Sequence, residues 1–200
     1  CEPYLTTDHR TMVEYPDRVW FGIRIMMKAL GVGNAVVGIE RNKPDAIESL
    51  TRTKPDDLNA EVIGLTVKYP QGAEKMLIKA VMGREVPSGK LPMHVGAVVQ
   101  NVGTIASIAE IFETGLPLIE RVVTVTGPGV NRPGNLLVPV GTKIRDILAF
   151  SGGVKENTTE VISGGPMMGA AQPDLDAPVT KGVTGLVVLK SILNALVVLA

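Results

Sequence analysis

The run Ala35-Val36-Val37-Gly38-Ile39-Glu40 sets the class of fold that this chain can form. It is short and apolar, follows Gly33-Asn34, and is typical of a buried strand. Pro44-Asp45 then opens a short helix that extends to about Arg52, because proline and an acidic residue both suit a first helical turn. A second strand is expected from Glu61 to Val67. Strands that alternate with helices predict a layered α/β domain.

Further elements extend this pattern on both sides. Apolar residues at spacings of three and four predict a helix over Asp17 to Leu30, and Gly31 stands where a left-handed C-terminal cap belongs. Helices are also expected from Gly72 to Met82 and from Gly103 to Glu113. A third strand is expected between them, from Val95 to Val99.

The pattern changes near Leu118, after which short strands predominate. Val122, Val123 and Val125 are β-branched, and the segment 131–135 has the composition of a turn. A single helix from about Lys143 to Phe150 lies among these strands. We therefore predict an α/β domain over residues 1–118, a small α+β domain of β-grasp size over 119–187, and a C-terminal remnant over 188–200.

Charge and cysteine content exclude several kinds of protein. Twenty basic residues balance 20 acidic ones, and no basic stripe is visible, so nucleic acid is not an expected partner. A single cysteine excludes an internal disulfide and any all-cysteine metal or iron–sulfur site made by this chain alone. His9 and His94 are too isolated to predict a metal site. A reducing compartment such as the cytosol is the simplest expectation.

The two ends of the chain suggest that it is a piece of a longer protein. It opens without methionine, directly into Cys1-Glu2-Pro3. The apolar tail from Leu186 to Ala200 is interrupted by Lys190 and two polar residues, so it falls short of the roughly 20 apolar residues that a membrane span needs. A strand followed by a terminal remnant is expected there, with no direct membrane span.

The first candidate binding segment is Cys1 to Arg10, which holds two carboxylates, three hydroxyl-bearing threonine and tyrosine positions, and an imidazole without helical periodicity. Carboxylates such as those of Glu2 and Asp8 accept strong hydrogen bonds from ribose or ribityl hydroxyls, and Thr6 lies between them. The alternative is a solvated terminal loop, and composition alone favours that alternative.

The second candidate is Tyr69-Pro70-Gln71-Gly72-Ala73-Glu74-Lys75, at a strand-to-helix junction. Exposed backbone N–H groups there suit an anion or an electron-rich ring edge, and Tyr69 is able to stack on a planar cofactor. Gly72 keeps the backbone close. The alternative is an ordinary helix start, in which Glu74 only complements the helix dipole.

The third candidate is Gln100-Asn101-Val102-Gly103-Thr104. Two amides that follow a strand and precede a helix stand where open α/β sheets bind ligands. Amides both donate to and accept from the pyrimidine edge of a flavin. The alternative, Asn101 as a simple helix N-cap, is equally compatible with the sequence.

Taken in this order, the three segments resemble the C subunit of the Rnf complex, a membrane-bound ferredoxin:NAD oxidoreductase. The resemblance extends from Cys1 to about Leu189 and includes Val122 to Gly127 and Ile162 to Gly169. The pattern is also similar to the flavoprotein subunit of respiratory complex I, which carries FMN and oxidises NADH. The segment from about Arg121 to Val187 resembles the soluble-ligand-binding β-grasp (SLBB) domain of these subunits.

The resemblance implies FMN and NAD as cofactors, with the flavin rather than a protein side chain carrying the chemistry. It implies cofactor-binding roles for a set of residues in the three segments, namely Glu2, Thr6, Asp8, Tyr69, Gly72, Glu74, Gln100, Asn101 and Thr104. The Gly-rich loop for the flavin phosphate would precede Cys1, and two 4Fe–4S clusters would follow this region. Without that loop, the isolated piece is expected to bind FMN weakly or not at all and to be inactive.

The implied partners are the other Rnf subunits and ferredoxin or a neighbouring iron–sulfur subunit. The implied location is the cytoplasmic side of the cell membrane, where the complex would hold the chain peripherally. Two alternatives remain open from the sequence. One is a non-catalytic ligand-binding or subunit-docking module, and the other is a flavoprotein subunit of the corrin-reductase type.

Overall fold

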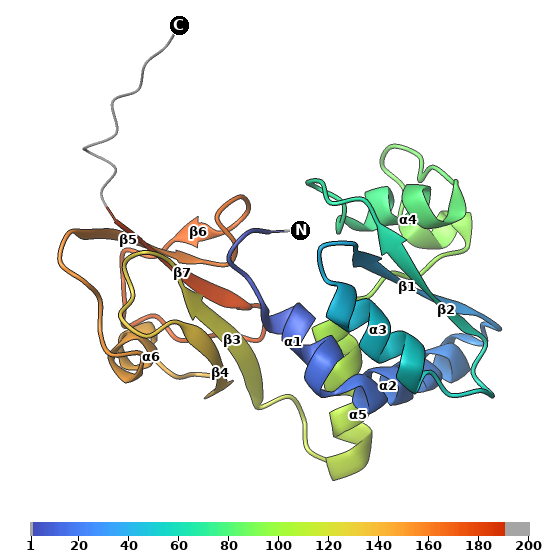
Figure 1. Cartoon of the computed structure of the whole chain (residues 1–200), viewed down its shortest axis with the longest axis horizontal. Helices are drawn as coiled ribbons and strands as arrows, with labels where there is room; N and C mark the ends of the chain where they lie inside the picture. Colours follow the sequence, from blue (N-terminus) through green and yellow to red (C-terminus); the bar gives the residue numbers. More distant parts are fainter. Residues whose placement is uncertain (1, 191–200) are drawn as a thin grey trace, which may run out of the picture. The chain divides into compact units, whose positions relative to one another are not determined.

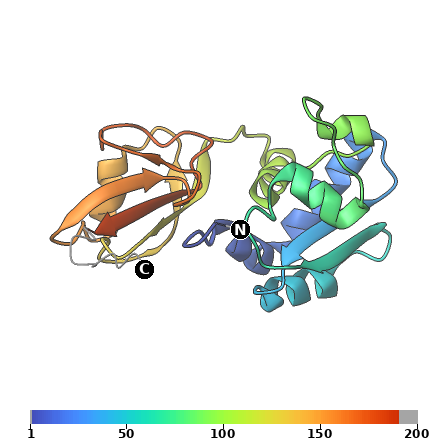
Figure 2. The same cartoon turned by 90° about the horizontal axis from the view of Figure 1, so that it is seen from above.

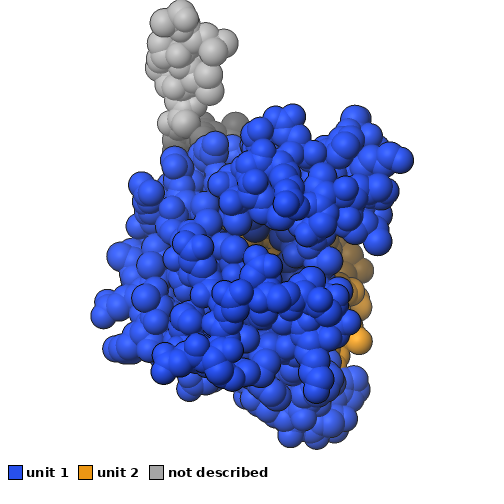
Figure 3. Space-filling view, turned by 90° about the vertical axis from the view of Figure 1, so that its right-hand side faces the viewer, with its two compact units in different colours: residues 1, 8–117 blue, residues 2–7, 118–200 orange. Residues whose placement is uncertain are grey.

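The computed structural model of the chain describes residues 2–190, which form two compact units. The first comprises residues 8–117, and the second comprises residues 2–7 together with 118–190 (Figure 3). The six residues Glu2–Thr7 therefore belong to the second unit, whereas the sequence assigned them to the first domain. The physical reason is a set of contacts with the second unit's strands, described below.

The first unit contains two parallel strands and the helices around them (Figure 1). Its elements, in chain order, are α1 (Thr7–Glu14), α2 (Pro16–Leu30), β1 (Ala35–Glu40), α3 (Pro44–Thr53), β2 (Ala60–Leu65), α4 (Glu74–Met82), the 3₁₀ helix η1 (Pro92–Val95) and α5 (Val102–Thr114).

Helices cover both faces of the β1–β2 sheet (Figure 2). The strands pair in parallel from Ala35 opposite Ala60 to Glu40 opposite Leu65. Ile39 points into the core that α2 and α3 share, whereas a Cβ on Gly38 would meet Leu77 of α4 at 3.0 Å. Successive strand residues face opposite sides, so α4 lies on the face opposite α2 and α3. The predicted layered α/β architecture is confirmed.

The core of the first unit surrounds Trp20, which is 1% exposed. The indole Nε1 donates to Thr53 Oγ1 at 3.3 Å, so its polar atom is satisfied inside an apolar environment. The other buried members of this core are Met12, Val19, Ile23, Ile39, Ala46, Leu50, Leu58 and Ile105. They come from α1, α2, β1, α3, α5 and, for Leu58, the connection between α3 and β2, and thus tie the helices to the sheet.

The second unit is a five-stranded sheet with one helix. Its elements are β3 (Glu120–Thr126), β4 (Gly134–Pro139), α6 (Ile144–Phe150), β5 (Thr158–Ser163), β6 (Ala170–Ala171) and β7 (Gly185–Lys190). The strand order is β4-β3-β7-β5-β6, with β3 and β7 parallel and the other pairs antiparallel. Ile144, Ile147 and Leu148 of α6 are buried against this sheet. The predicted β-grasp arrangement is confirmed.

Most helix and strand predictions are confirmed within two residues. The third predicted strand, Val95–Val99, is wrong. Pro92–Val95 forms η1 instead, and Gly96 ends it in the left-handed conformation at φ 71°, its N–H donating to Met93 O. Within residues 2–190, the chain from there to Asn101 pairs with no strand. A short apolar run becomes a strand only where an adjacent strand supplies backbone hydrogen bonds. The local sequence pattern does not show whether such a strand lies beside it.

Two terminal predictions also change. Residues 7–10 form the first turn of α1 rather than a loop. Met12 of the same helix is buried in the core, and its burial stabilises the helix that begins at Thr7. At the other end, the strand predicted from Leu186 is confirmed as β7, which continues to Lys190. The rest of the predicted tail, 191–200, lies outside the described residues.

Candidate functional site

The side chain of Asn101 joins the first and third candidate segments. Its Nδ2 donates to Asp8 Oδ2 at 2.7 Å, and its Oδ1 accepts from the Gly103 backbone N–H at 2.8 Å. The second bond makes Asn101 the N-cap of α5, whereas its role as a ligand contact stays a prediction. The bond to Asp8 is an additional contact that a cap does not need. It fixes the orientation of the amide, with one N–H and part of the Oδ1 acceptor capacity still available.

Gln100 and Thr104 flank this amide and are exposed. A Cβ on Gly103 would lie 3.0 Å from Asn101 Oδ1 and 3.5 Å from Asp8 Oδ1, so the absence of a side chain there keeps the backbone close to both polar groups. The arrangement presents an oriented amide beside a carboxylate at the start of a helix. Such a surface is chemically suited to a ring edge that has alternating donors and acceptors.

The second candidate segment leads into α4. Gly72 and Glu74 are exposed, and Tyr69 is 40% exposed. Gln71 is buried, and its backbone N–H donates to Lys68 O at 2.9 Å, which holds the turn. Ala73 occupies the N-cap position without any side-chain cap, so the first turn of α4 relies on backbone groups alone. Helix starts of this kind present N–H donors to an electron-rich group.

Glu2 and Thr6 belong to the second unit. The Thr6 N–H donates to Thr124 Oγ1 at 3.1 Å, and its hydroxyl donates to Asn135 Oδ1 at 3.0 Å. Thr6 therefore fastens the chain to β3 and β4. Glu2 Oε2 accepts from the Met167 backbone N–H at 3.0 Å, and Glu2 Oε1 is a buried oxygen without a hydrogen-bond partner among the described residues.

The structure thus brings together some predicted residues. Asp8 and Asn101 are in direct contact, and Glu2 and Thr6 both lie on the β-grasp unit. The convergence of all three segments on one slot stays a prediction, as do the binding roles of the individual residues.

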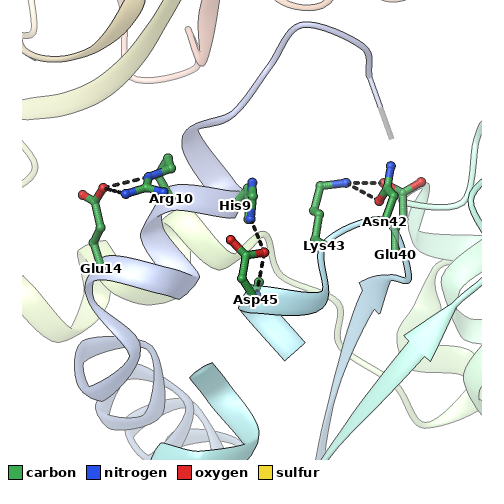
Figure 4. A network of polar contacts seen from close by, with 8 residues as sticks. His9, Arg10, Glu14, Glu40, Asn42, Lys43 and Asp45 are labelled. Atoms are coloured by element: carbon green, nitrogen blue, oxygen red, sulfur yellow. Dashed lines mark hydrogen bonds and ion pairs between the residues drawn. The ribbon is translucent and has the colours of Figure 1, made fainter. Parts of the chain in front are cut away.

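A polar cluster near the end of β1 was missed by the sequence reasoning (Figure 4). Lys43 Nζ donates to Glu40 Oε2 at 2.8 Å and to Asn42 Oδ1 at 3.0 Å. Glu40 is the last residue of the parallel strand β1, and Asn42 and Lys43 follow it, at the end of the sheet where ligands commonly bind in α/β folds. That position was a usable signal, because Glu40 ends the predicted strand and Pro44 starts the predicted helix.

His9 ties α1 to the first turn of α3. Its Nε2 lies 2.7 Å from Asp45 Oδ1, which also accepts from the Ala46 N–H at 3.0 Å (Figure 4). The hydrogen bond from His9 is the main reason why the pKa of Asp45 is lowered. A carboxyl group with a lowered pKa stabilises the fold above its ordinary pKa, and this contribution is lost as pH falls through the lowered value.

Two kinds of feature, a metal-ligating cluster and a membrane-length apolar helix, are absent from residues 2–190. No group of three or more histidine, cysteine, aspartate or glutamate side chains there is arranged to hold a metal ion. In the same part of the chain, no helix has the length and apolar character needed to cross a membrane.

An α/β unit followed by a β-grasp unit is the domain order expected for an FMN-binding subunit, and the matching family models agree with it. Residues 1–110 match the family of the Nuo51 FMN-binding domain, and residues 122–171 match the SLBB domain. The chain belongs to the Nuo51 FMN-binding family. The family predicted from the sequence motifs is confirmed.

Particular relatives are similar over most of this chain. It is 54% identical over 186 residues to the C subunit of the proton-translocating ferredoxin:NAD(+) oxidoreductase complex of Clostridium ljungdahlii, covering 93% of this chain and 40% of that protein. It is 47% identical to the C subunit of the Na(+)-translocating ferredoxin:NAD(+) oxidoreductase complex of Acetobacterium woodii, covering 94% and 43%. The chain thus spans about two fifths of the length of these curated relatives. They favour the electron-transfer prediction over a docking module.

A solved structure shares the fold. A chain of an NAD+-reducing NiFe hydrogenase in its H2-reduced state matches with a TM-score of 0.78 at 19% identity, covering 94% of this chain and 38% of that one. At that identity the similarity supports the fold, which agrees with the predicted combination of an α/β unit and a β-grasp unit.

Proposed function

We propose that this chain is the nucleotide- and flavin-handling part of an electron-transfer subunit that moves electrons between NAD(H), FMN and iron–sulfur clusters or ferredoxin. Family membership and the similarity to C subunits of ferredoxin:NAD(+) oxidoreductase complexes support this. The structural observation that carries it is Glu2 Oε1, a buried acceptor without a donor among the described residues. Buried carboxylate oxygens normally have partners, so this oxygen fits a ligand hydroxyl.

FMN would supply the redox chemistry, because a flavin takes up electrons in pairs from a nicotinamide and passes them on singly. The protein residues would bind FMN and NAD(H) and orient them. In this proposal Asn101 and Gln100 hydrogen-bond the pyrimidine edge of the flavin, and Asp8 keeps the Asn101 amide in a fixed orientation. Tyr69 would stack on a planar ring. Gly72, Glu74 and Thr104 would complete the lining at the starts of α4 and α5.

Glu2 would accept hydrogen bonds from the ribose of NAD(H). Thr6 fastens the segment that carries it to β3 and β4. A carboxylate in that role also repels a 2′-phosphate, which favours NAD over NADP. With one cysteine in the chain, the iron–sulfur clusters would be held by other parts of the subunit.

The partners in this proposal are the other subunits of an ion-translocating oxidoreductase complex, together with ferredoxin or a neighbouring iron–sulfur subunit. The complex would hold the subunit peripherally at the cytoplasmic side of the membrane. The similarity to subunits of ion-translocating complexes supports this assignment. Attachment in this proposal comes through those partners.

Replacing Glu2 with glutamine in the intact subunit tests the nucleotide role. We expect the preference for NADH over NADPH, measured as a ratio of kcat/KM values, to fall about tenfold, because a charged acceptor contributes more than a neutral one. Glu156→Gln, an exposed glutamate of the same unit, is the control and should leave the ratio unchanged. An unaltered ratio in Glu2→Gln would refute the role of Glu2.

Replacing Asn101 tests the flavin role separately from helix capping. Serine also caps α5 but lacks the amide group that donates to Asp8, so Asn101→Ser should keep the helix and weaken FMN binding about tenfold. Asn101→Asp should weaken it more, because it places a second carboxylate beside Asp8. FMN affinity is measured by flavin fluorescence titration, and helix content by circular dichroism. Unchanged FMN affinity in Asn101→Ser would rule out the amide as a flavin contact.

A further inference from the structure

A glycine-rich turn joins β5 to β6 in the second unit. We call residues 164–169 (Gly164-Gly165-Pro166-Met167-Met168-Gly169) the 164–169 turn. Backbone bonds hold both of its ends: the Gly164 N–H donates to Gly185 O at 2.8 Å, and the Gly169 N–H donates to Gly165 O at 2.7 Å. The turn is thereby fastened to β7 and closed on itself, so its remaining groups have defined positions.

The side chain of Glu2 lies directly against this turn. The Met167 N–H donates to Glu2 Oε2 at 3.0 Å. A Cβ built on Gly165 would stand 2.3 Å from the Glu2 carboxyl carbon, 2.4 Å from Oε2 and 2.6 Å from Cγ. The carboxylate therefore occupies the space that any side chain at position 165 would fill. One oxygen is taken by the turn, and the other, Oε1, is buried and unpartnered within the described chain.

We propose that the 164–169 turn is a positioning element for nucleotide selectivity, which binds Oε2 of Glu2 and leaves Oε1 as the oxygen that would accept from the ribose. This inference rests on the proposed role of Glu2 as the ribose acceptor. A glutamate side chain has several rotatable bonds, and ordering it during binding would cost conformational entropy. The turn orders it beforehand.

The fixed position of the Glu2 side chain also explains how one carboxylate would discriminate between NADH and NADPH. A free glutamate could rotate away from a 2′-phosphate and lose its repulsive effect. A glutamate whose Oε2 is bonded to Met167 and whose stem lies against Gly165 cannot do so without breaking that bond. Discrimination of this kind requires that the repulsive group stay in place.

Gly165→Ala perturbs this contact selectively. Gly165 is not among the glycines with positive φ, so alanine fits its backbone conformation. The atoms that the new methyl group would meet belong to the flexible Glu2 side chain rather than to the backbone. We expect the unit to stay folded and the carboxylate to be displaced.

The experiment uses the intact FMN-loaded subunit. In Gly165→Ala we expect KM for NADH to rise about tenfold with kcat nearly unchanged, and the NADH-over-NADPH preference to fall as in Glu2→Gln. The double variant should be no worse than either single variant, because both remove the same interaction. Gly182→Ala is the matched control, since that glycine of the same unit has no neighbour within 4 Å and no positive φ.

A second readout does not depend on turnover. Amide hydrogen exchange of the peptide that contains Met167 should accelerate in Gly165→Ala and in Glu2→Ala, because the acceptor for that N–H is displaced or removed. Exchange in Gly182→Ala should match the unmodified subunit. Unchanged exchange in both Gly165→Ala and Glu2→Ala would overturn the contact itself.

The remaining outcomes separate the turn from the proposed function. If Glu2→Gln alters the nucleotide preference and Gly165→Ala does not, the turn is no positioning element, whereas Glu2 keeps its role. If Glu2→Gln alters nothing, the role of Glu2 fails and the role of the turn fails with it. Additive losses in the double variant would also overturn the proposal.

Discussion

Replacing Trp20 with alanine is expected to lower the free energy of unfolding of the first unit by about 3–5 kcal/mol. Trp20 is 1% exposed and is among the largest fully buried side chains of the described residues. Its loss would leave a cavity among α2, α3 and the sheet and would remove the indole N–H that donates to Thr53 Oγ1. The surrounding helices can relax into such a cavity only in part.

Urea unfolding followed by far-ultraviolet circular dichroism measures this effect without relying on the fluorescence of the lost tryptophan. Phe112→Ala is the control, because that aromatic side chain of α5 is 67% exposed and its removal should change stability by about 0.5 kcal/mol or less. Equal losses in the two variants would show that Trp20 is not the centre of the core.

Gly22→Ala is expected to be the second most damaging change, with a loss of about 3 kcal/mol. A Cβ at Gly22 would lie 2.1 Å from the Ile105 carbonyl oxygen and 2.8 Å from Ile105 Cγ2. The first contact is with backbone, so α5 itself would have to move away from α2. In an open helix position the same change would stabilise the protein by about 1 kcal/mol, because alanine is the better helix former.

This displacement would also reach the candidate flavin residues. Asn101 caps α5 four residues before Ile105 and donates to Asp8. Weaker FMN binding in Gly22→Ala is therefore expected along with the lower unfolding midpoint. Gly33→Ala is the matched control, since Gly33 has ordinary φ and no neighbour within 4 Å. A Gly22→Ala protein as stable as Gly33→Ala would contradict the close packing of α2 on α5.

Sequence motifs were a good guide to the family and a partial guide to the candidate residues. The three segments by themselves predict the flavoprotein family, and the family match covers residues 1–110. Asn101 and Asp8 lie in separate candidate segments, and local pattern cannot predict their hydrogen bond because they are 93 residues apart. The Lys43–Glu40 pair was overlooked because a lysine three residues after a glutamate is common on any protein surface.

The local sequence pattern was sufficient to predict a helix or strand wherever the signals that form it lie within the segment itself. The helix α2 was predictable because its apolar spacing and Gly31 cap lie within the segment, and β1 because its run is bounded by turn residues. The region from Val95 to Val99 was mispredicted, because strand formation depends on a partner that lies elsewhere in the chain.

Tertiary structure alone decided where Glu2 belongs. Its neighbours in sequence continue into α1 of the first unit, yet its carboxylate rests on Gly165 and Met167 of the second. No periodicity or composition within residues 2–7 contains that information, since the contact joins side chain to backbone across 165 positions. Long-range packing is set by the whole folded chain, and so the environment of this carboxylate could be seen only in the structure.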